Sequence, residues 1–296
     1  MKRFFTAIAI LIVCFGLFCG CHSQEKSKQT SFFEWTDSYG RHVSLEKEPQ
    51  RIVSLSPAIT EVIYLIGAQD KLVGVTDFCN YPPEARQKSR LGGLQNINME
   101  SLLATRPDVV LISSIVSKKD VEKIEKTGIP VIAIKEEKKL EGLVNVMQVV
   151  GKVSNRQCIA DSIARNWQER IRQLEAGNRK ADSTCKSVYY VVGYGDAGDF
   201  TAPKDSHIHG IITLAGGRNI GQQLTSWNIS REFLFECDPD IILVREEDFE
   251  KFCHLYPYSK LKAVQQHHVY PINSGWIDIV SPRNLLAVEK LKTILD

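Results

Sequence analysis

The run Gly193–Gly198 could do chemistry, because its glycines follow the GxGxxG pattern of loops that hold a dinucleotide phosphate. That pattern binds phosphate where a helix begins directly after the glycines. Here Asp199, Thr201 and Pro203 follow, a composition that indicates a loop instead. We therefore interpret the run as a flexible loop.

Two pairs of histidines could ligate a metal ion, His207 with His209 and His267 with His268. Histidines two positions apart share a face only on a strand, whereas the segment from His207 to Leu214 has helical character. We expect surface or helix-capping histidines and no metal site. One imidazole could still reach a metal centre carried by a bound molecule, since neutral imidazole is a common ligand.

Other catalytic signatures are missing from the sequence. GxSxG, HExxH and P-loop patterns do not occur, and the acidic residues form no recognisable catalytic set. We predict no catalytic residues and no resident cofactor. The alternative is a secreted metal-dependent hydrolase that uses the histidines, and turnover would distinguish it from a protein that only binds.

The amino terminus resembles an export signal. Lys2 and Arg3 precede an apolar run, Phe4–Phe18, that is shorter than the roughly 20 residues of a membrane span. Cys21 follows Gly20 as in a bacterial lipobox, where the thiol is lipidated and becomes the first residue of the mature chain. An ordinary cleaved signal or an uncleaved anchor is the alternative.

We therefore predict a signal peptide over residues 1–20 and a lipidated tether over residues 21–34. The protein would lie in the cell envelope outside the cytoplasm, held by its lipid in the periplasm or at the outer face of the cytoplasmic membrane. Loss of Lys2 and Arg3 lowers the formal charge from +2 to 0, which argues against a nucleic-acid partner. Five cysteines remain beyond Cys21, so at least one thiol is unpaired and the pairing stays open: Cys79, Cys158, Cys185, Cys237 and Cys253.

Short apolar runs alternate with helical patterns along the rest of the chain. Phe33–Leu45 has the pattern of a hairpin. Ser56 and Pro57 are suited to cap and open a helix that Gly67 ends. Buried strands are predicted at residues 51–55, 72–75, 109–112, 131–134, 188–192, 241–244 and 269–272. Such alternation is typical of α/β structure with mostly parallel sheets.

The middle of the chain has no strand pattern between residues 140 and 180. Its apolar residues recur at helical spacing and predict a long helix that ends near Gly177. We interpret Met147 and Trp167 as packing residues on this helix. The domains expected are an N-terminal lobe over 35–150, a bridging helix over 151–180 and a C-terminal lobe over 181–296, whose final helix opens at Ser281-Pro282.

The two predicted lobes share an internal repeat. A polar cap, a short helix, a Pro-Asp turn and a buried strand follow one another without gaps after residue 97 and again after residue 229. Glu100 and Glu232 occupy equivalent places, in the first turn of each short helix. Identical spacing with an identical glutamate predicts a pseudo-symmetric pair of units.

Several motifs together resemble the class of periplasmic binding proteins for vitamin B12, haem and iron–siderophores. The resemblance covers nearly all of the chain from about Phe33 onward, and the order of the motifs is more specific than any one of them. The motifs are residues 51–57, 60–61, 67–68, 73–75, 80–83, 91–93, 106–110, 214–220 and 281–283. This resemblance implies two α/β lobes joined by one long rigid helix, the helical-backbone binding-protein fold. It also implies a ligand cleft, a monomer, and docking onto an ABC permease with its ATPase subunits.

Within that class the cleft segments are most similar to those of the B12-binding members. A corrinoid is a broad, mostly apolar disc that flat aromatic walls can bury. Leu94 stands where the B12-binding members carry a tryptophan, and haem or an iron–siderophore is the alternative ligand. The ligand-binding residues implied by the resemblance are Phe78, Tyr81, Leu94, Tyr194, Trp227, Trp276 and Arg283. The docking residues it implies are Glu100 and Glu232.

Overall fold

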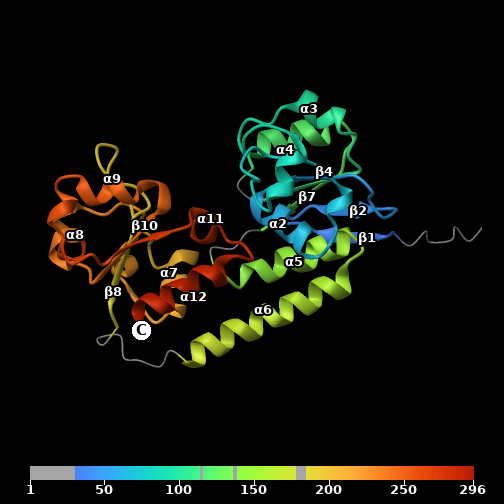
Figure 1. Cartoon of the computed structure of the whole chain (residues 1–296). Helices are drawn as coiled ribbons and strands as arrows, with labels where there is room; N and C mark the ends of the chain where they lie inside the picture. The colour runs from blue at the N-terminus through green and yellow to red at the C-terminus, as the bar shows by residue number, and fades with distance from the viewer. Residues whose placement is uncertain (1–30, 114–115, 136–138, 178–184) are drawn as a thin grey trace, which may run out of the picture. The chain divides into compact units, whose positions relative to one another are not determined.

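The computed structural model describes residues 31–113, 116–135, 139–177 and 185–296 (Figure 1). The chain divides into two units, Met1–Ser31 and Phe32–Asp296, and the second holds every element described below. The predicted signal peptide and Cys21 lie outside the described residues.

A five-stranded parallel sheet forms the centre of the N-terminal lobe. Its strands lie in the order β5-β4-β3-β6-β7. All residues of β3, β6 and β7 are buried, as expected for strands covered on both faces. The strands are β3 (Ile52–Leu55), β4 (Leu72–Val75), β5 (Ser89–Arg90), β6 (Val109–Ser113) and β7 (Val131–Ile134).

Helices and a separate hairpin complete this lobe (Figure 1). The predicted hairpin is confirmed, with Phe33 opposite Leu45 in an antiparallel pair. The elements are β1 (Phe33–Thr36), β2 (His42–Leu45), α2 (Pro57–Leu65), η1 (Gln69–Lys71), η2 (Pro83–Gln87), α3 (Met99–Ala104), α4 (Lys118–Glu125) and α5 (Gly142–Val153). Gly67 ends the first helix pattern with a φ of 72°, a conformation that glycine adopts without strain.

The C-terminal lobe has a second, four-stranded parallel sheet in the order β11-β10-β8-β9. Its strands are β8 (Ser187–Tyr190), β9 (Arg218–Asn219), β10 (Ile241–Arg245) and β11 (Val269–Ile272). Its α-helices are α7 (His207–Leu214), α8 (Arg231–Cys237), α9 (Phe249–His254), α10 (Lys262–Gln265), α11 (Ser274–Ile277) and α12 (Asn284–Leu295). Its 3₁₀ helices are η4 (Ile220–Gln223), η5 (Glu246–Asp248) and η6 (Tyr258–Lys260).

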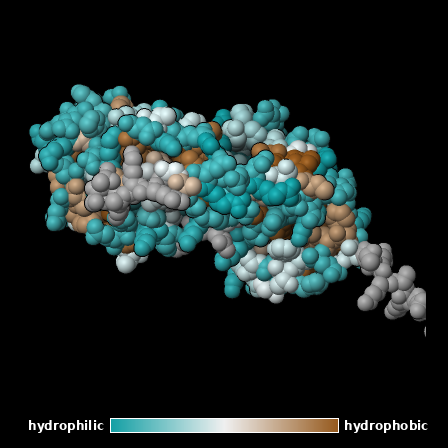
Figure 2. All heavy atoms as spheres, turned by 90° about the horizontal axis from the view of Figure 1, so that it is seen from below, coloured by the Kyte–Doolittle hydropathy of each residue, from teal (hydrophilic) through white to brown (hydrophobic). Residues whose placement is uncertain are grey.

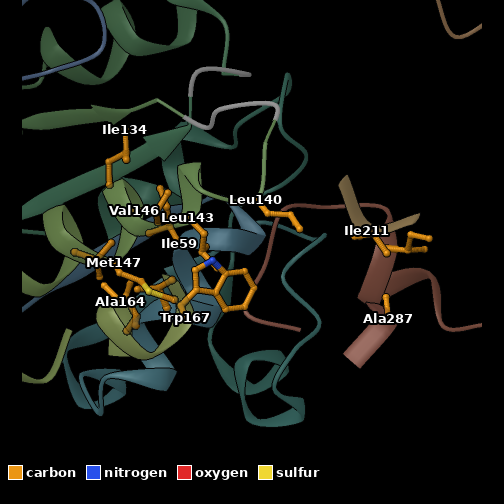
Figure 3. Packing of buried hydrophobic residues seen from close by; sticks show 14 of the residues in the cluster. Ile59, Ile134, Leu140, Leu143, Val146, Met147, Ala164, Trp167, Ile211 and Ala287 are labelled. Carbon is orange, nitrogen blue, oxygen red and sulfur yellow. The ribbon is translucent and has the colours of Figure 1, made fainter. Parts of the chain in front are cut away.

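The long helix α6 (Gln157–Gly177) connects the two lobes. It lies beside α5 and also touches α7, and Arg170 on α6 pairs with Glu289 on α12 at 3.2 Å. Trp167 is buried between α5 and α6 beside Met147 and Ala164 (Figure 3). Both residues therefore pack as predicted, although Met147 belongs to α5. One hydrophobic core runs from this cluster into the C-terminal lobe.

Three local predictions are corrected. Ser56 makes no capping hydrogen bond with its side chain, although Pro57 does open α2. The last helix begins at Asn284, because residues 281–283 form a turn in which the Ser281 N–H donates to Asn284 Oδ1 at 2.7 Å. Strand β8 ends at Tyr190 instead of residue 192, because the Val192 N–H leaves the sheet and donates to the Phe200 carbonyl at 3.0 Å.

The predicted internal repeat is present in both lobes. Asn98 caps α3 by accepting from the Ser101 N–H, and Ser230 caps α8 by accepting from the Phe233 N–H. Each helix is followed by a residue with positive φ directly before a Pro-Asp pair, Arg106 at 45° in one lobe and Asp238 at 38° in the other. Strands β6 and β10 then begin at equivalent places, beside β3 and β8.

Candidate ligand-binding cleft

A cavity of about 460 Å³ lies where loops of the two lobes meet. Its walls follow the carboxyl ends of β3, β4 and β11, the edge at which open parallel sheets usually bind ligands. The lining residues are Pro57, Glu61, Phe78, Asn80, Tyr81, Pro83, Arg86, Asn273, Ser274, Gly275, Asp278, Ile279 and Arg283. We call this cavity the cleft.

Two aromatic side chains of the loop after β4 face the cleft. Phe78 is 58% exposed and Tyr81 is 44% exposed, high values for large rings. The face that Figure 2 shows is mostly hydrophilic, with separate hydrophobic patches. Rings left open in a cavity are therefore candidates for ligand contact.

Hydrogen bonds of a buried cysteine and of an arginine hold the loop that carries these rings. Cys79, between them, is fully buried, and its Sγ lies 3.2 Å from the hydroxyl groups of Thr60 and Thr76. Burial raises the pKa of the Cys79 thiol, so it stays protonated. Arg90 Nη1 donates to the Thr76 carbonyl at 2.7 Å and the Cys79 carbonyl at 3.1 Å. These contacts hold the loop so that Phe78 and Tyr81 point outward.

Arg283 reaches into the cleft from the turn before α12. Its Nε donates to Glu61 Oε2 at 2.9 Å and its Nη2 donates to Oε1 at 2.5 Å, so the pair is bidentate. Burial raises the pKa of Glu61, although Arg283 opposes that effect. The guanidinium carbon of Arg283 lies 4.1 Å from the centroid of the Tyr81 ring, within the range of a cation–π contact.

A second charged group supports the floor of the cleft. Asp278 accepts a hydrogen bond from the Tyr190 hydroxyl and another from Arg245 Nε, the latter at 2.8 Å. Burial, together with the Asp278 carboxylate, raises the pKa of the Tyr190 hydroxyl, which therefore remains a donor. This network fixes the segment between β11 and α12 that carries Asp278 and Arg283.

The remaining aromatic candidates lie elsewhere. Tyr194 packs edge-to-face against Phe252 and Tyr258, with centroids 5.3 and 5.9 Å away, and its hydroxyl donates to Asp248 at 3.1 Å. Burial and the Asp248 carboxylate raise the pKa of Tyr194 to about 12. Trp227 is 41% exposed, and its carbonyl accepts from the Thr201 N–H at 2.8 Å.

The structure thus brings three of the seven predicted ligand residues to one cavity: Phe78, Tyr81 and Arg283. Leu94 is partly buried, and Trp276 packs partly buried against the hydrophobic core. The prediction missed Glu61 and Asp278 as cleft residues. Glu61 falls within the motifs quoted above, but only its pairing with a residue 222 positions away identifies it as part of the cleft.

The glycine run after β8 forms a hairpin, in agreement with its interpretation as a loop. Gly193 pairs antiparallel with Phe200, and the segment holds no helix. Asp199 accepts from the Tyr258 hydroxyl and from Arg231 Nε, the latter at 2.8 Å. Arg231 is the first residue of α8, so this network ties the hairpin to the start of that helix.

The histidines considered above differ in their exposure. His207 is largely buried, and its Nε2 lies 2.7 Å from the Ile277 carbonyl oxygen. His267 and His268 are exposed. Among the residues that the structure describes, no group of three histidine, cysteine or acidic side chains could hold a metal ion. Within the described ranges, Cys79, Cys158, Cys237 and Cys253 are free thiols.

Glu100 and Glu232 occupy matching positions, as the repeat predicts. Each is the second residue of its helix, α3 or α8, and each is exposed. A carboxylate in this position is favoured by the helix dipole. Over the part of the chain that the structure describes, no helix is both long enough and apolar enough to cross a membrane.

Comparison with known proteins shows which proteins this chain is similar to. A family model described as periplasmic binding protein matches residues 52–274. An uncharacterized ABC transporter substrate-binding lipoprotein of Bacillus subtilis, YvrC, is 25% identical over 304 residues, covering 98% of this chain and 96% of that protein. A vitamin B12-binding protein of Vibrio cholerae is 25% identical over 251 residues, covering 83% of this chain and 89% of that protein.

The solved structure of the periplasmic haem-binding protein HutB of Vibrio cholerae superposes with a TM-score of 0.74 at 23% identity, covering 83% of this chain and 98% of HutB. That likeness confirms the predicted fold of two α/β lobes with a bridging helix. The family model extends from β3 to the start of α11, so it includes both sheets and the long helix. The chain therefore belongs to the periplasmic binding protein family.

Proposed function

We propose that this protein is the substrate-binding component of an ABC importer and that it captures a corrinoid in the cleft. The observation that carries the proposal is a cavity of about 460 Å³ built jointly by both lobes, with Phe78 and Tyr81 open on its wall. Flat rings of this kind bury a broad apolar disc at low entropic cost. The B12-binding relative from Vibrio cholerae supports this ligand class.

Haem is the second candidate, and one observation favours it. Tyr81 lines the cavity, and a tyrosine oxygen is a known axial ligand of haem iron. The guanidinium carbon of Arg283 lies 4.1 Å from the centroid of the same ring. We place the corrinoid first because the curated relative that covers 83% of this chain is named as a vitamin B12-binding protein.

We further propose that Glu100 and Glu232 dock the protein on the permease. Both lie on exposed first turns of equivalent helices, one in each lobe. A transporter with two equivalent membrane subunits presents two similar surfaces, and a partner with one matching carboxylate per lobe suits them. Charges at the rim of such an interface set registration and encounter rate more than affinity.

We also propose that Cys21 carries the lipid that holds a monomer to the membrane, after removal of residues 1–20. The mature protein would then consist of a tether over 21–34, lobes over 35–150 and 181–296, and the bridging segment 151–180. The Bacillus subtilis relative is named as a lipoprotein, which supports the proposed lipid anchor. Metabolic labelling with a fatty acid, compared between the native chain and Cys21→Ala, tests it.

Calorimetric titration with cyanocobalamin, haemin and a ferric siderophore, each under the same conditions, tests the ligand. We expect one tight site for cyanocobalamin, with no chemical change in the recovered ligand. Tighter binding of haemin would make haem the ligand instead. Turnover of any ligand with a bound metal would favour the hydrolase alternative over a binding protein.

A further inference from the structure

Three basic side chains lie at every second position of the segment that leads from η2 into β5, and two of them bind the protein itself. Lys88 Nζ donates to the Gln69 carbonyl at 3.0 Å. Arg90 Nη1 donates to two backbone carbonyls of the loop, as described above. Among the residues that the structure describes, the Arg86 side chain makes no hydrogen bond and no ion pair. Its guanidinium group therefore has five N–H donors available for a bound molecule.

Arg86 lines the cleft together with Phe78 and Tyr81 of the same loop. Its backbone is held in place by the residue before it. Ala85 is fully buried, and its N–H donates to the Pro82 carbonyl at 2.8 Å. The Arg86 side chain is exposed. A fixed turn therefore presents an unpaired cation beside the two open rings.

The other charged side chains of the cleft are neutralised within the protein. Glu61 forms the bidentate pair with Arg283, and Asp278 accepts from Arg245 Nε at 2.8 Å. Each carboxylate that lines the cavity thus has a guanidinium group of its own. Arg86 is the cation in excess, so the cleft carries one net positive charge at this position.

The charge of Arg86 gains in strength when a ligand covers the rings. Two exposed charges attract each other weakly, because water screens both. A flat ligand against Phe78 and Tyr81 displaces water and lowers the screening around Arg86. A planar guanidinium group binds the oxygens of a phosphate or carboxylate through parallel N–H donors. Glu84, the acidic residue on the same turn, does not line the cleft. An oxyanion at the edge of the ligand is therefore the partner that suits Arg86.

We infer that Arg86 is a specificity-determining residue of the cleft, which binds an oxyanion, a phosphate or carboxylate group, at the edge of the ligand. This inference rests on the proposed function, because it takes a tetrapyrrole-like disc against Phe78 and Tyr81 as the ligand. Two sources supply this chemistry. A complete corrinoid carries a phosphodiester in its nucleotide loop, and a haem carries two propionates.

Two pairs of probes, each with and without the oxyanion, test the inference by calorimetry. Cyanocobalamin contains the phosphodiester, whereas dicyanocobinamide lacks the nucleotide loop with its phosphate. Haemin contains the propionates, whereas its dimethyl ester lacks their charge. We expect Arg86→Gln to weaken binding of the charged member of a pair by about fivefold, as the loss of one ion pair at the rim would, and to change binding of the other member by less than about twofold. The pair that responds identifies the source of the oxyanion.

The dependence of affinity on ionic strength is a second readout, which a purely structural role of Arg86 would not change. Added sodium chloride should weaken binding of the charged member to the native protein more than binding of the other member, because salt screens exposed charge pairs. This additional salt dependence should disappear in Arg86→Gln. If only the charged member binds measurably, its salt dependence in the two proteins decides the question.

Two variants serve as controls. Arg86→Lys keeps the positive charge and should retain most of the affinity for the charged member. Arg165→Gln removes an exposed arginine on α6 that does not line the cleft, so it should leave all affinities unchanged. Thermal unfolding of each variant shows whether it is folded. Equal loss of affinity for both members of each pair, or the same loss in Arg165→Gln, would overturn the assignment to Arg86.

The same measurements separate this inference from the proposed function. Unchanged binding of every probe by folded Arg86→Gln overturns the inference, while the tetrapyrrole still stands as the ligand of the cleft. Failure of the native protein to bind any of the four probes overturns the proposed ligand class itself. The two failures are therefore distinguishable.

Discussion

The repeated units at α3 and α8 have the same order of backbone features, but different hydrogen bonds hold them in place. Both have a polar cap, a glutamate at the second helical position, a residue with positive φ and a Pro-Asp turn. In the N-terminal lobe, Asp108 accepts from the backbone N–H groups of Gln50 and Arg51 at 2.7 and 2.9 Å. In the C-terminal lobe, Asp240 accepts from both the N–H and the hydroxyl of Ser187, each at 2.7 Å.

The segments that lead to the two helices differ further. Before α3, the chain is held by backbone bonds, with the Asn98 N–H donating to the Leu91 carbonyl at 2.8 Å. Before α8, the chain is held by side-chain hydrogen bonds, because Arg231 binds Asp199 and also donates to the Gly195 carbonyl at 2.7 Å. The shared parts therefore build the frame and present the two glutamates. The segments that differ do not line the cleft.

The variant with the largest expected effect changes the two glutamates that the repeated units share. Glu100→Lys combined with Glu232→Lys should abolish ligand uptake in cells and leave ligand affinity in solution unchanged, because both carboxylates are exposed and neither lines the cleft. Uptake of labelled ligand and calorimetry on the purified protein measure the two quantities. Glu122→Lys with Glu236→Lys, which also reverses two exposed helical carboxylates, is the matched control. Normal transport by the first double variant would end the docking proposal.

The next effect compares the aromatic walls of the two lobes. Phe78→Ala should weaken ligand binding by about 1–3 kcal/mol, the usual contribution of a buried large apolar side chain. Trp227→Ala should cost as much only if the ligand spans both lobes. Tyr256→Ala removes a ring that is 76% exposed and does not line the cleft, so it should change nothing. Calorimetry that shows equal affinity for Phe78→Ala and the native protein would remove this ring from the site.

A smaller effect, on the free energy of unfolding, is expected from variants in the two Pro-Asp turns. Asp240→Ala and Asp108→Ala should each lower the free energy of unfolding by about 1–2 kcal/mol, because each leaves N–H groups at the start of a strand without an acceptor. Burial opposes ionisation of Asp240, but the hydrogen bonds from Ser187 outweigh it and lower its pKa. The stabilisation by Asp240 should therefore be present at neutral pH and be lost as the pH falls below its ordinary pKa of about 3.8.

Denaturant unfolding at several pH values measures that loss. The native protein and Asp240→Ala should converge in stability as the solution is acidified. A constant difference down to the lowest pH at which the protein folds would mean that the Asp240 charge does not stabilise the turn. Asp296→Ala, at the exposed carboxyl terminus, is a control that should leave the free energy of unfolding unchanged.

The smallest effect concerns His207, the first residue of α7, which lies outside both repeated units. Burial lowers its pKa from the ordinary value of 6.5, while the Ile277 carbonyl and Asp278 partly oppose the shift. Below pH 6.5 the unfolded chain therefore binds more protons than the folded chain. The free energy of unfolding should decrease as the pH falls from 6.5 toward the lowered pKa of the folded state. We expect a loss of about 1 kcal/mol or less that His207→Gln removes. A pH profile of unfolding that is identical in the variant would contradict this.

Much of the fold follows from local sequence patterns. Apolar runs of four or five residues predicted all the longer parallel strands, because a strand covered on both faces has to be apolar throughout. The boundaries that were wrong depend on distant partners. Tyr190 ends β8 because Val192 pairs with Phe200, and α12 starts late because Ser281 binds Asn284. The two-residue strands β5 and β9 are too short for any periodicity to reveal them.

The sequence by itself determined the class of fold, the pseudo-symmetric units and the places of Glu100 and Glu232, since these depend on periodicity and on fixed spacing along the chain. Only the tertiary structure decided which side chains share the cleft. Trp227 and Tyr194 do not line it, while Glu61 does, 222 residues before its partner Arg283. Charge compensation across such a separation depends on how the two lobes fold together, and no local pattern records it.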